Sequence, residues 1–218
     1  MCVSAMATQP YPPPMPTREV DHGPSVEQAV SLYAAGYFPM DDVAEAHNPL
    51  PFYAAERRAV LELDEASRAA LRRRVRRSLR AGEDEGWRLV RDQRFDDVLE
   101  ACALPREPGD GVWITTRLRR LYRRLYEAGL AHSFEIEAAG ELAAGLVGVT
   151  LGRAAMLESM FHWVADAGNV LLARTLDDLA ARGFVLCDIQ LPTDHTTRMG
   201  ARLVPREDYE RRLRAALS

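Results

Sequence analysis

The region from 132 to 191 most constrains the fold of this chain. Three strand-like runs follow one another with short turns at Gly140 and Gly152, and they span 132–137, 142–151 and 154–161. Connections of this length imply an antiparallel meander. A helical pattern over 170–182 ends at Gly183 and leads directly into an apolar strand over 184–191. The sequence therefore predicts an α+β fold with a mixed sheet.

The order of antiparallel strands, one helix and a further strand resembles the core of the GNAT acyltransferases. That resemblance implies a GNAT-like mixed sheet with flanking helices, and by itself it fixes no chemistry. We expect this domain to span 83–218, beginning in an acidic, glycine-flanked stretch at 82–86 that is typical of a boundary or a surface loop. A small N-terminal domain, with one basic helix over 67–80, is expected across 25–82.

Composition and the first 24 residues indicate a cytoplasmic protein. Residues 1–24 are rich in proline and lack the basic start and apolar run of a secretory signal, so we expect an extended lead-in. The sequence has no run of about 18 apolar residues that could span a membrane. Cys2, Cys102 and Cys187 are scattered, as are the five histidines, so neither a disulfide framework nor a metal site is expected. We expect a monomer.

The charged residues are segregated along the chain. The net charge is −4, and all 28 basic residues are arginine. Seven arginines and no acid fall within 67–80, and five arginines and no acid fall within 113–126. One such run is most often a solvated helix face. Two of them in an acidic protein make a phosphate-binding surface an equally good interpretation. The candidates for nucleic-acid contact are Arg73, Arg76, Arg77, Arg80, Arg120 and Arg124.

Polar side chains interrupt two of the apolar strands. Asp188 and Gln190 follow the apolar run 184–187 and, two residues apart on a strand, would project from the same face. An acid and an amide are costly to bury there unless they bind something, and ligand crevices form at the carboxyl ends of such strands. Glu158 and Met160 repeat the pattern on the preceding strand. We interpret Glu158, Asp188 and Gln190 as one site, the alternative being that they fasten neighbouring loops.

Several familiar chemistries are absent from the sequence. It contains no P-loop, no Rossmann glycine fingerprint and no Gly-x-Ser-x-Gly nucleophile elbow. A GNAT acetyltransferase would place its pyrophosphate loop just before the helix at 170–182, where this chain has one glycine and one aspartate over 162–169. Because that is a poor anion cradle, coenzyme A is disfavoured.

A series of short motifs runs along the chain from about Tyr33 to Arg212. Its earlier motifs are Gly36-Tyr37-Phe38-Pro39, Arg58-Ala59-Val60, Ala101-Cys102-Ala103, Trp113-Ile114-Thr115 and Ala131-His132-Ser133-Phe134-Glu135. Its later motifs are Glu158-Ser159-Met160-Phe161, Asp188-Ile189-Gln190, Asp194-His195-Thr196, Met199-Gly200-Ala201 and Pro205-Arg206. Each motif is weak alone. Together, in order and spacing, they resemble those of the leucyl/phenylalanyl-tRNA–protein transferases of the bacterial N-degron pathway.

This resemblance implies a reaction and its participants. Such enzymes transfer Leu or Phe from an aminoacyl-tRNA to proteins that begin with Arg or Lys, which marks those proteins for degradation. The resemblance also implies no metal and no dissociable cofactor. The implied catalytic residues are Asp188, Gln190 and Glu158. The implied substrate-binding residues are Trp113, Met160, Phe161, Ser159 and Tyr53, and the arginine helices would bind the tRNA.

The chemistry of this transfer fits the polar residues. An aminoacyl ester is already activated, so the reaction needs an unprotonated α-amine, with a pKa of about 7.7–8.0, held against the ester carbonyl. We expect Gln190 to accept a hydrogen bond from that amine, with Asp188 orienting Gln190 or relaying the proton. Glu158 would hold the amino group of the donor or the positively charged acceptor.

The sequence departs from the family pattern at several places, among them Ile189 in place of a cysteine and the absence of a Gly-rich entry before the first helix. The usual Trp-Ser-Pro-Asp-Pro-Arg reads Tyr53-Ala54-Ala55-Glu56-Arg57-Arg58, and Leu157 replaces a glycine. The usual Asn-Ala-Ser-Lys reads Asp166-Ala167-Gly168-Asn169, which removes a lysine. These changes affect which aminoacyl group and which acceptor we expect. Met is a further candidate for the transferred residue, and proteins with acidic N-termini are an alternative class of acceptor. The sequence is also compatible with a GNAT-like N-acetyltransferase that uses acetyl-CoA, and with a non-catalytic tRNA-binding relative.

Overall fold

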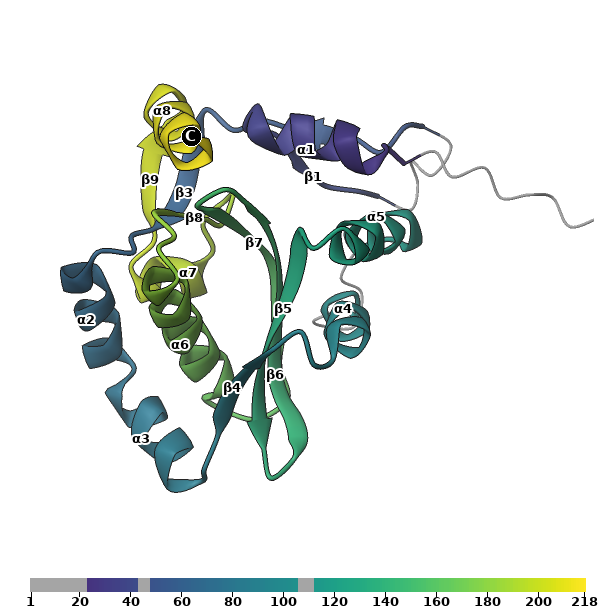
Figure 1. Cartoon of the computed structure of the whole chain (residues 1–218). Coiled ribbons are helices and arrows are strands. Elements are labelled where there is room, and N and C mark those ends of the chain that lie inside the picture. The colour runs from purple at the N-terminus through teal and green to yellow at the C-terminus, as the bar shows by residue number, and fades with distance from the viewer. Residues whose placement is uncertain (1–22, 43–47, 106–111) are drawn as a thin grey trace, which may run out of the picture.

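A seven-stranded sheet forms the centre of the molecule in the computed structural model, which describes residues 23–42, 48–105 and 112–218 (Figure 1). The strand order is β4-β5-β6-β7-β8-β3-β9. In that order the strands span Arg88–Arg91, Ala131–Ala138, Glu141–Leu151, Ala154–His162, Leu186–Asp188, Arg57–Leu61 and Arg202–Pro205. Neighbouring strands of this sheet are antiparallel except for β7 and β8, which run parallel.

The predicted meander is confirmed, whereas the strand expected over 184–191 forms only over Leu186–Asp188. Strands β5, β6 and β7 pair antiparallel in chain order. Helix α6 (Ala167–Ala181) then covers one face of the sheet and returns the chain to β8, which lies beside β7 and parallel to it. This is the α+β, GNAT-like order that the sequence predicts, with a mixed sheet and flanking helices.

Helices cover both faces of the sheet, and each face has its own apolar core (Figure 1). Helices α1, α4, α5 and α8 cover the face that we call face A, and they span Val26–Ala34, Phe95–Cys102, Thr116–Glu127 and Arg206–Leu217. Helices α2, α3 and α6 cover the opposite face, face B, where α2 spans Glu65–Arg74 and α3 spans Arg76–Asp84. Helix α7 (Asp194–Met199) follows β8.

Two of the helices that cover face A, α1 and α5, begin at side-chain caps. Ser25 accepts a hydrogen bond from the amide of Gln28, whose side chain in turn accepts from the amide of Ser25, which completes the capping box of α1. Thr115 caps α5 by accepting from the amide of Leu118. The expected inward stripe of α5 is buried and comprises Leu118, Leu121, Tyr122 and Leu125.

The basic helix expected over 67–80 is wrong in its extent. Two helices cover this stretch, because Val75 leaves the helical conformation (φ −98°, ψ 19°) between α2 and α3. The expected break at 82–86 is also misplaced, since α3 continues through Gly82 to Asp84. Gly82 is needed there because a Cβ atom would lie 2.9 Å from the ring of Trp87. Close packing, and not a chain break, explains the glycine.

The sheet crosses the predicted boundary near residue 82. Strand β3 lies within 25–82, yet it pairs with both β8 and β9 from the C-terminal part of the chain. The division into 25–82 and 83–218 stays a prediction, and most of the expected lead-in at 1–24 lies outside the described residues. Within the described ranges, no helix is long and apolar enough to cross a membrane.

The close packing of Gly82 against Trp87 predicts a selective loss of stability. Replacing Gly82 with Val should lower the free energy of unfolding by about 1–3 kcal/mol, because the added side chain must displace a buried ring. Glu83→Val, at the exposed neighbouring position of the same helix, should cost less than about 1 kcal/mol. Urea titration of both variants checks this, and equal losses would contradict it.

Candidate active site

Strands β7 and β8 separate at a fork, and Gln190 lies in it. The two strands are paired only from Ala154 to Met156 on β7. From there to His162, β7 is paired with β6 but no longer with β8. The chain leaves β8 after Asp188, and Gln190 adopts a left-handed conformation with φ 57°. With its amide nitrogen toward β7, Gln190 donates to the carbonyl oxygens of Leu157 (3.1 Å) and Ile189 (3.0 Å). The amide oxygen takes part in neither bond.

The expectation that Asp188 and Gln190 share one face of a strand is therefore wrong. The strand ends at Asp188, so the alternation of side chains does not extend to Gln190. The two residues are joined differently, because the backbone amide of Gln190 donates to Oδ1 of Asp188 at 2.8 Å. Asp188 thus holds the backbone that presents the Gln190 side chain.

Asp188 is completely buried and its carboxylate is fully engaged. Arg58 donates to it twice, from Nε to Oδ1 at 2.9 Å and from Nη2 to Oδ2 at 2.7 Å. The hydroxyl of Tyr209 donates to Oδ2 at 2.8 Å. A buried carboxylate is tolerated only when it is paired in this way. Burial lowers the pKa of Arg58, but Asp188 outweighs that effect and the net shift is upward, so Arg58 stays charged.

Arg58 itself is held from three directions. Its guanidinium lies 4.4 Å from the ring centroid of Phe38 and 4.7 Å from that of Tyr209, both within range of a cation–π interaction. Its Nη1 donates to the carbonyl oxygen of Gly36 at 3.2 Å. Arg58 thereby connects β3 to the turn after α1 and to α8, and it is 1% exposed.

Glu158 reaches the same face through a β-bulge. In the β6–β7 register Ser159 pairs with Val147 and Leu157 pairs with Gly148, so Glu158 is the extra residue. The hydroxyl of Tyr33 on α1 donates to Oε1 of Glu158 at 2.9 Å. The buried hydroxyl of Tyr122 on α5 interacts with Glu158 electrostatically without hydrogen-bond geometry.

Burial raises the pKa of Glu158 to about 8. The nearby carboxylate of Asp188 raises it further, whereas the hydrogen bond from Tyr33 and the charge of Arg58 lower it. Glu158 is therefore a neutral acid at pH 7 in the free protein. We call the residues Arg58, Asp188, Glu158, Tyr33, Tyr122 and Tyr209 the polar cluster of face A.

The substrate-binding candidates are divided between the two faces. Phe161 and Trp113 pack against the core of face A, whereas Met160 packs against the core of face B. The expected shared face for Glu158 and Met160 is wrong, because the bulge shifts the alternation between them. Ser159 is half-buried in β7, and Tyr53, at the end of β2 (Phe52–Tyr53), is 49% exposed.

Four members of the polar cluster were not predicted as site residues: Arg58, Tyr33, Tyr122 and Tyr209. Arg58 had the clearest signal, as a charge that directly precedes the apolar run Ala59-Val60-Leu61. The tyrosines lie on helical stripes that are equally typical of a core, so only the fold shows that their hydroxyls meet carboxylates.

The two arginine-rich regions lie on opposite sides of the sheet (Figure 1). On α2 and α3, the side chains of Arg73, Arg76, Arg77 and Arg80 are exposed, and they form no ion pair with any described residue. On α5, acids of the protein pair with three arginines: Arg117 with Asp41, Arg119 with Glu100, and Arg123 with Asp96 and Glu100. Arg120 and Arg124 are half-buried. Of these two regions, α2 and α3 therefore present the exposed arginines that form no ion pair with a described residue.

The start of α6 is poorly suited to a pyrophosphate. Ala167 and Gly168 are buried in its first turn, and the ring of His162 lies against Gly168. Oδ1 of Asp166 accepts hydrogen bonds from Ser78 (2.7 Å) and Asn169 (3.3 Å), which ties α3 to α6. An anion at this helix start would meet a carboxylate, which agrees with the sequence-based argument against coenzyme A.

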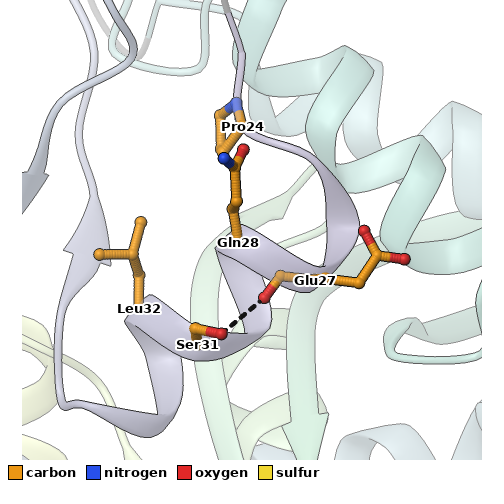
Figure 2. A pocket seen from close by; sticks show the side chains of 5 residues that line it. All are labelled: Pro24, Glu27, Gln28, Ser31 and Leu32. Atoms are coloured by element: carbon orange, nitrogen blue, oxygen red, sulfur yellow. Dashed lines mark hydrogen bonds between the residues drawn. The ribbon is translucent and has the colours of Figure 1, made fainter.

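The cavity on α1 lies away from the polar cluster, and the described residues form no metal-binding group. A shallow cavity of about 430 Å³ runs along the outer side of α1, lined by Pro24, Glu27, Gln28, Ser31 and Leu32 (Figure 2). It is formed by one helix and does not include the polar cluster. Among the described residues, no group of three or more His, Cys, Asp or Glu side chains is arranged to hold a metal ion.

Comparison with known sequences decides the family. Residues 60–214 match the sequence profile described as leucyl/phenylalanyl-tRNA protein transferase. The chain belongs to this family. It is 40% identical over 194 residues to the leucyl/phenylalanyl-tRNA–protein transferase of Anaeromyxobacter dehalogenans (strain 2CP-C), covering 88% of this chain and 78% of that relative. The corresponding protein of Caulobacter vibrioides (strain NA1000 / CB15N) is 40% identical over 200 residues, covering 91% of this chain and 88% of the relative.

Solved structures show only a distant likeness. L-PGS from Bacillus licheniformis has a TM-score of 0.43 and 12% identity, covering 77% of this chain and 51% of that chain. The likeness is too low to carry an argument. The assignment to the family rests on sequence alone.

The raised pKa of Glu158 predicts a pH-dependent stability. Its pKa is about 8 in the folded protein and near the ordinary 4.5 when unfolded, so between these values the folded state holds a proton that the unfolded state lacks. Stability should therefore fall by about 1 kcal/mol for each pH unit through this window. Glu158→Gln removes this dependence, so the variant should gain stability over the wild type as pH rises from about 5 to 8.

Urea denaturation at several pH values measures this difference. Glu141→Gln, at an exposed position in β6, is the matched control and should follow the wild type. A constant difference between Glu158→Gln and the wild type across the window would show that Glu158 ionises normally.

Proposed function

We propose that this protein transfers Leu or Phe from an aminoacyl-tRNA to the N-terminal α-amine of proteins that begin with Arg or Lys, marking them for degradation in the cytoplasm. The observation that carries the proposal is the position of Gln190, which is fixed in the β7–β8 fork by Asp188 and Leu157. Membership of the family supports the donor and the reaction type.

In this reaction the acceptor nitrogen attacks the ester carbonyl carbon of the aminoacyl-tRNA. A C–N bond forms, the ester C–O bond breaks, and the 3′-terminal ribose hydroxyl of the tRNA leaves with a proton. We assign Gln190 to contact with the attacking amine, because its amide oxygen is unused in the bonds that hold its nitrogen. A weakly basic amide orients the amine and does not remove its proton.

Asp188 is better described as a positioning residue than as a proton relay. Its two oxygens already accept hydrogen bonds from Arg58, Tyr209 and the amide of Gln190, and it is completely buried. Arg58 and Tyr209 hold Asp188, and Asp188 holds Gln190. Asp188 therefore affects the reaction by fixing the position of Gln190.

Glu158 is suited to exchange a proton with a substrate amine. Its pKa of about 8 matches the pKa of an α-amine, about 7.7–8.0, so a proton can pass between them at little cost. An ammonium group bound beside it would favour the ionised carboxylate. The same group can therefore hold an ammonium and accept a proton from it.

A transfer assay tests the proposal. Leu-, Phe- and Met-tRNA are each supplied with reporter peptides that begin with Arg, Lys, Asp or Glu. Transfer of Leu or Phe to the Arg and Lys peptides supports it. Transfer only to the Asp and Glu peptides would show that the acceptors are proteins with acidic N-termini. Binding of tRNA without transfer would indicate a non-catalytic relative. Thermal stabilisation by coenzyme A, and not by charged tRNA, would favour the acetyltransferase alternative.

The role of Gln190 has its own test. Gln190→Ala should lower kcat by about 10²-fold while the affinity for tRNA is unchanged, because the proposed role of the amide oxygen is to orient the reacting amine and not to bind the tRNA. Gln93→Ala, at an exposed position between β4 and α4, is the matched control and should behave as the wild type. Unchanged kcat in Gln190→Ala, measured by single-turnover transfer, would remove Gln190 from the mechanism.

The exposed arginines of α2 and α3 are proposed to bind the tRNA backbone. Replacing Arg73, Arg76, Arg77 and Arg80 with Gln should weaken binding at low salt and reduce its salt dependence, by about 0.7 in log–log slope for each phosphate that an arginine no longer neutralises. A control that removes the same charge at ion-paired positions replaces Arg119, Arg123, Arg182 and Arg211. Equal salt slopes in the two variants, measured by filter binding, would refute a dedicated surface.

A further inference from the structure

A second buried ion pair, between Asp41 and Arg117, lies next to the polar cluster. Arg117 donates to both carboxylate oxygens, from Nε to Oδ2 at 2.7 Å and from Nη2 to Oδ1 at 2.5 Å. The hydroxyl of Thr115 also donates to Asp41. Asp41 is 7% exposed and Arg117 is 9% exposed. Burial raises the pKa of Asp41, but the bonds from Arg117 and Thr115 outweigh it and lower the net value.

Asp41 lies just after β1 (Phe38–Pro39), which pairs with β2 in a small two-stranded sheet. Arg117 also donates from Nη1 to the carbonyl oxygen of Asn48, so it holds both 36–42 and 48–53. The ends of these segments contact the polar cluster, since Phe38 lies over Arg58 and Phe52 packs edge-on against Tyr33. Tyr53, whose ring is exposed, is the next residue in the chain after Phe52.

The other side of the pair belongs to the start of α5. Thr115 is the N-cap of this helix, and Trp113 lies two residues before it. Tyr122, which faces Glu158, lies on the same helix one and a half turns after Arg117. A single ion pair thus connects the segment that carries Tyr53 to the segment that carries Trp113.

Stability alone is a weak reason for such a pair. Removing two charges from water costs several kcal/mol, and apolar residues of similar size often stabilise a protein equally well. What a bidentate arginine–carboxylate pair adds is a fixed relative orientation of the two segments that it joins.

We propose that Asp41 and Arg117 are positioning residues that set the spacing between Trp113 and Tyr53, and through it the site for the terminal aminoacyl-adenosine of the donor tRNA. This inference rests on the proposed function. The pair touches neither donor nor acceptor. It acts by fixing the segment 48–53, which ends in Tyr53, relative to the start of α5, which follows Trp113.

The test uses a double variant that keeps the fold. Asp41→Leu combined with Arg117→Met replaces the pair with apolar side chains, and urea denaturation should show nearly wild-type stability. Its KM for Phe-tRNA should rise about tenfold or more, with kcat and the KM for an Arg peptide within about twofold of the wild type. The same rise is expected for phenylalanyl-adenosine, because only the terminal nucleoside is affected. Arg117→Lys keeps one bond to Asp41 and should be intermediate.

A control and a binding measurement separate the possible failures. Arg119→Met with Glu100→Gln removes an exposed ion pair from the same helix and should leave every KM unchanged. Calorimetry with a non-hydrolysable phenylalanyl-adenosine amide reports the site without turnover. Absence of transfer by the wild type would overturn the proposed function. Wild-type affinity of the double variant for the amide, or a change confined to the peptide KM, would overturn the positioning role.

Discussion

The buried ion pair between Arg58 and Asp188 is the interaction on which the site depends. Asp188 ends the central strand β8, and Arg58 lies on β3, the strand beside it. Each ion would be prohibitively costly to bury alone, so the strands can pair only in the register that joins the charges. The ring of Tyr209, the ring of Phe38 and the carbonyl of Gly36 fix Arg58 in turn. The fold and the geometry of Gln190 are therefore determined by the same contacts.

Electrostatics divide the molecule into two functional sides. Face A carries the buried charges of the polar cluster, and on this face Arg58, Arg117, Arg119 and Arg123 pair with Asp188, Asp41, Asp96 and Glu100. Face B carries exposed arginines on α2 and α3. In a protein with a net charge of −4, this segregation allows a polyanion to approach along one side without neutralising the charges that hold the site together.

Much of the fold was predictable because its signals are local. The meander, the caps at Ser25 and Thr115, and the buried stripe of α5 follow from turn residues and periodicity. The site was predictable only as a set of polar residues on strands. The bulge at Glu158 and the left-handed turn at Gln190 both break the alternation of side chains between the two faces of a strand. Neither of them is predicted by a pattern of residues in the sequence. The tyrosine partners come from α1, α5 and α8, so their convergence depends on tertiary packing. Gly82 misled because close packing and chain reversal both favour glycine.

The bulge in β7 has a consequence for how such a protein can diverge. By inserting one residue opposite Gly148, it gives Glu158 and Phe161 to face A while Leu157 and Met160 go to face B. One short strand therefore serves two environments, a charged one and an apolar one. Substitutions on the apolar side can accumulate without disturbing the acid that shares their backbone. The replacement of a glycine by Leu157 is a change of this kind, since its side chain packs into the core of face B while its carbonyl still accepts the bond from Gln190. The apolar packing and the buried acid can therefore change independently on the two sides of one strand.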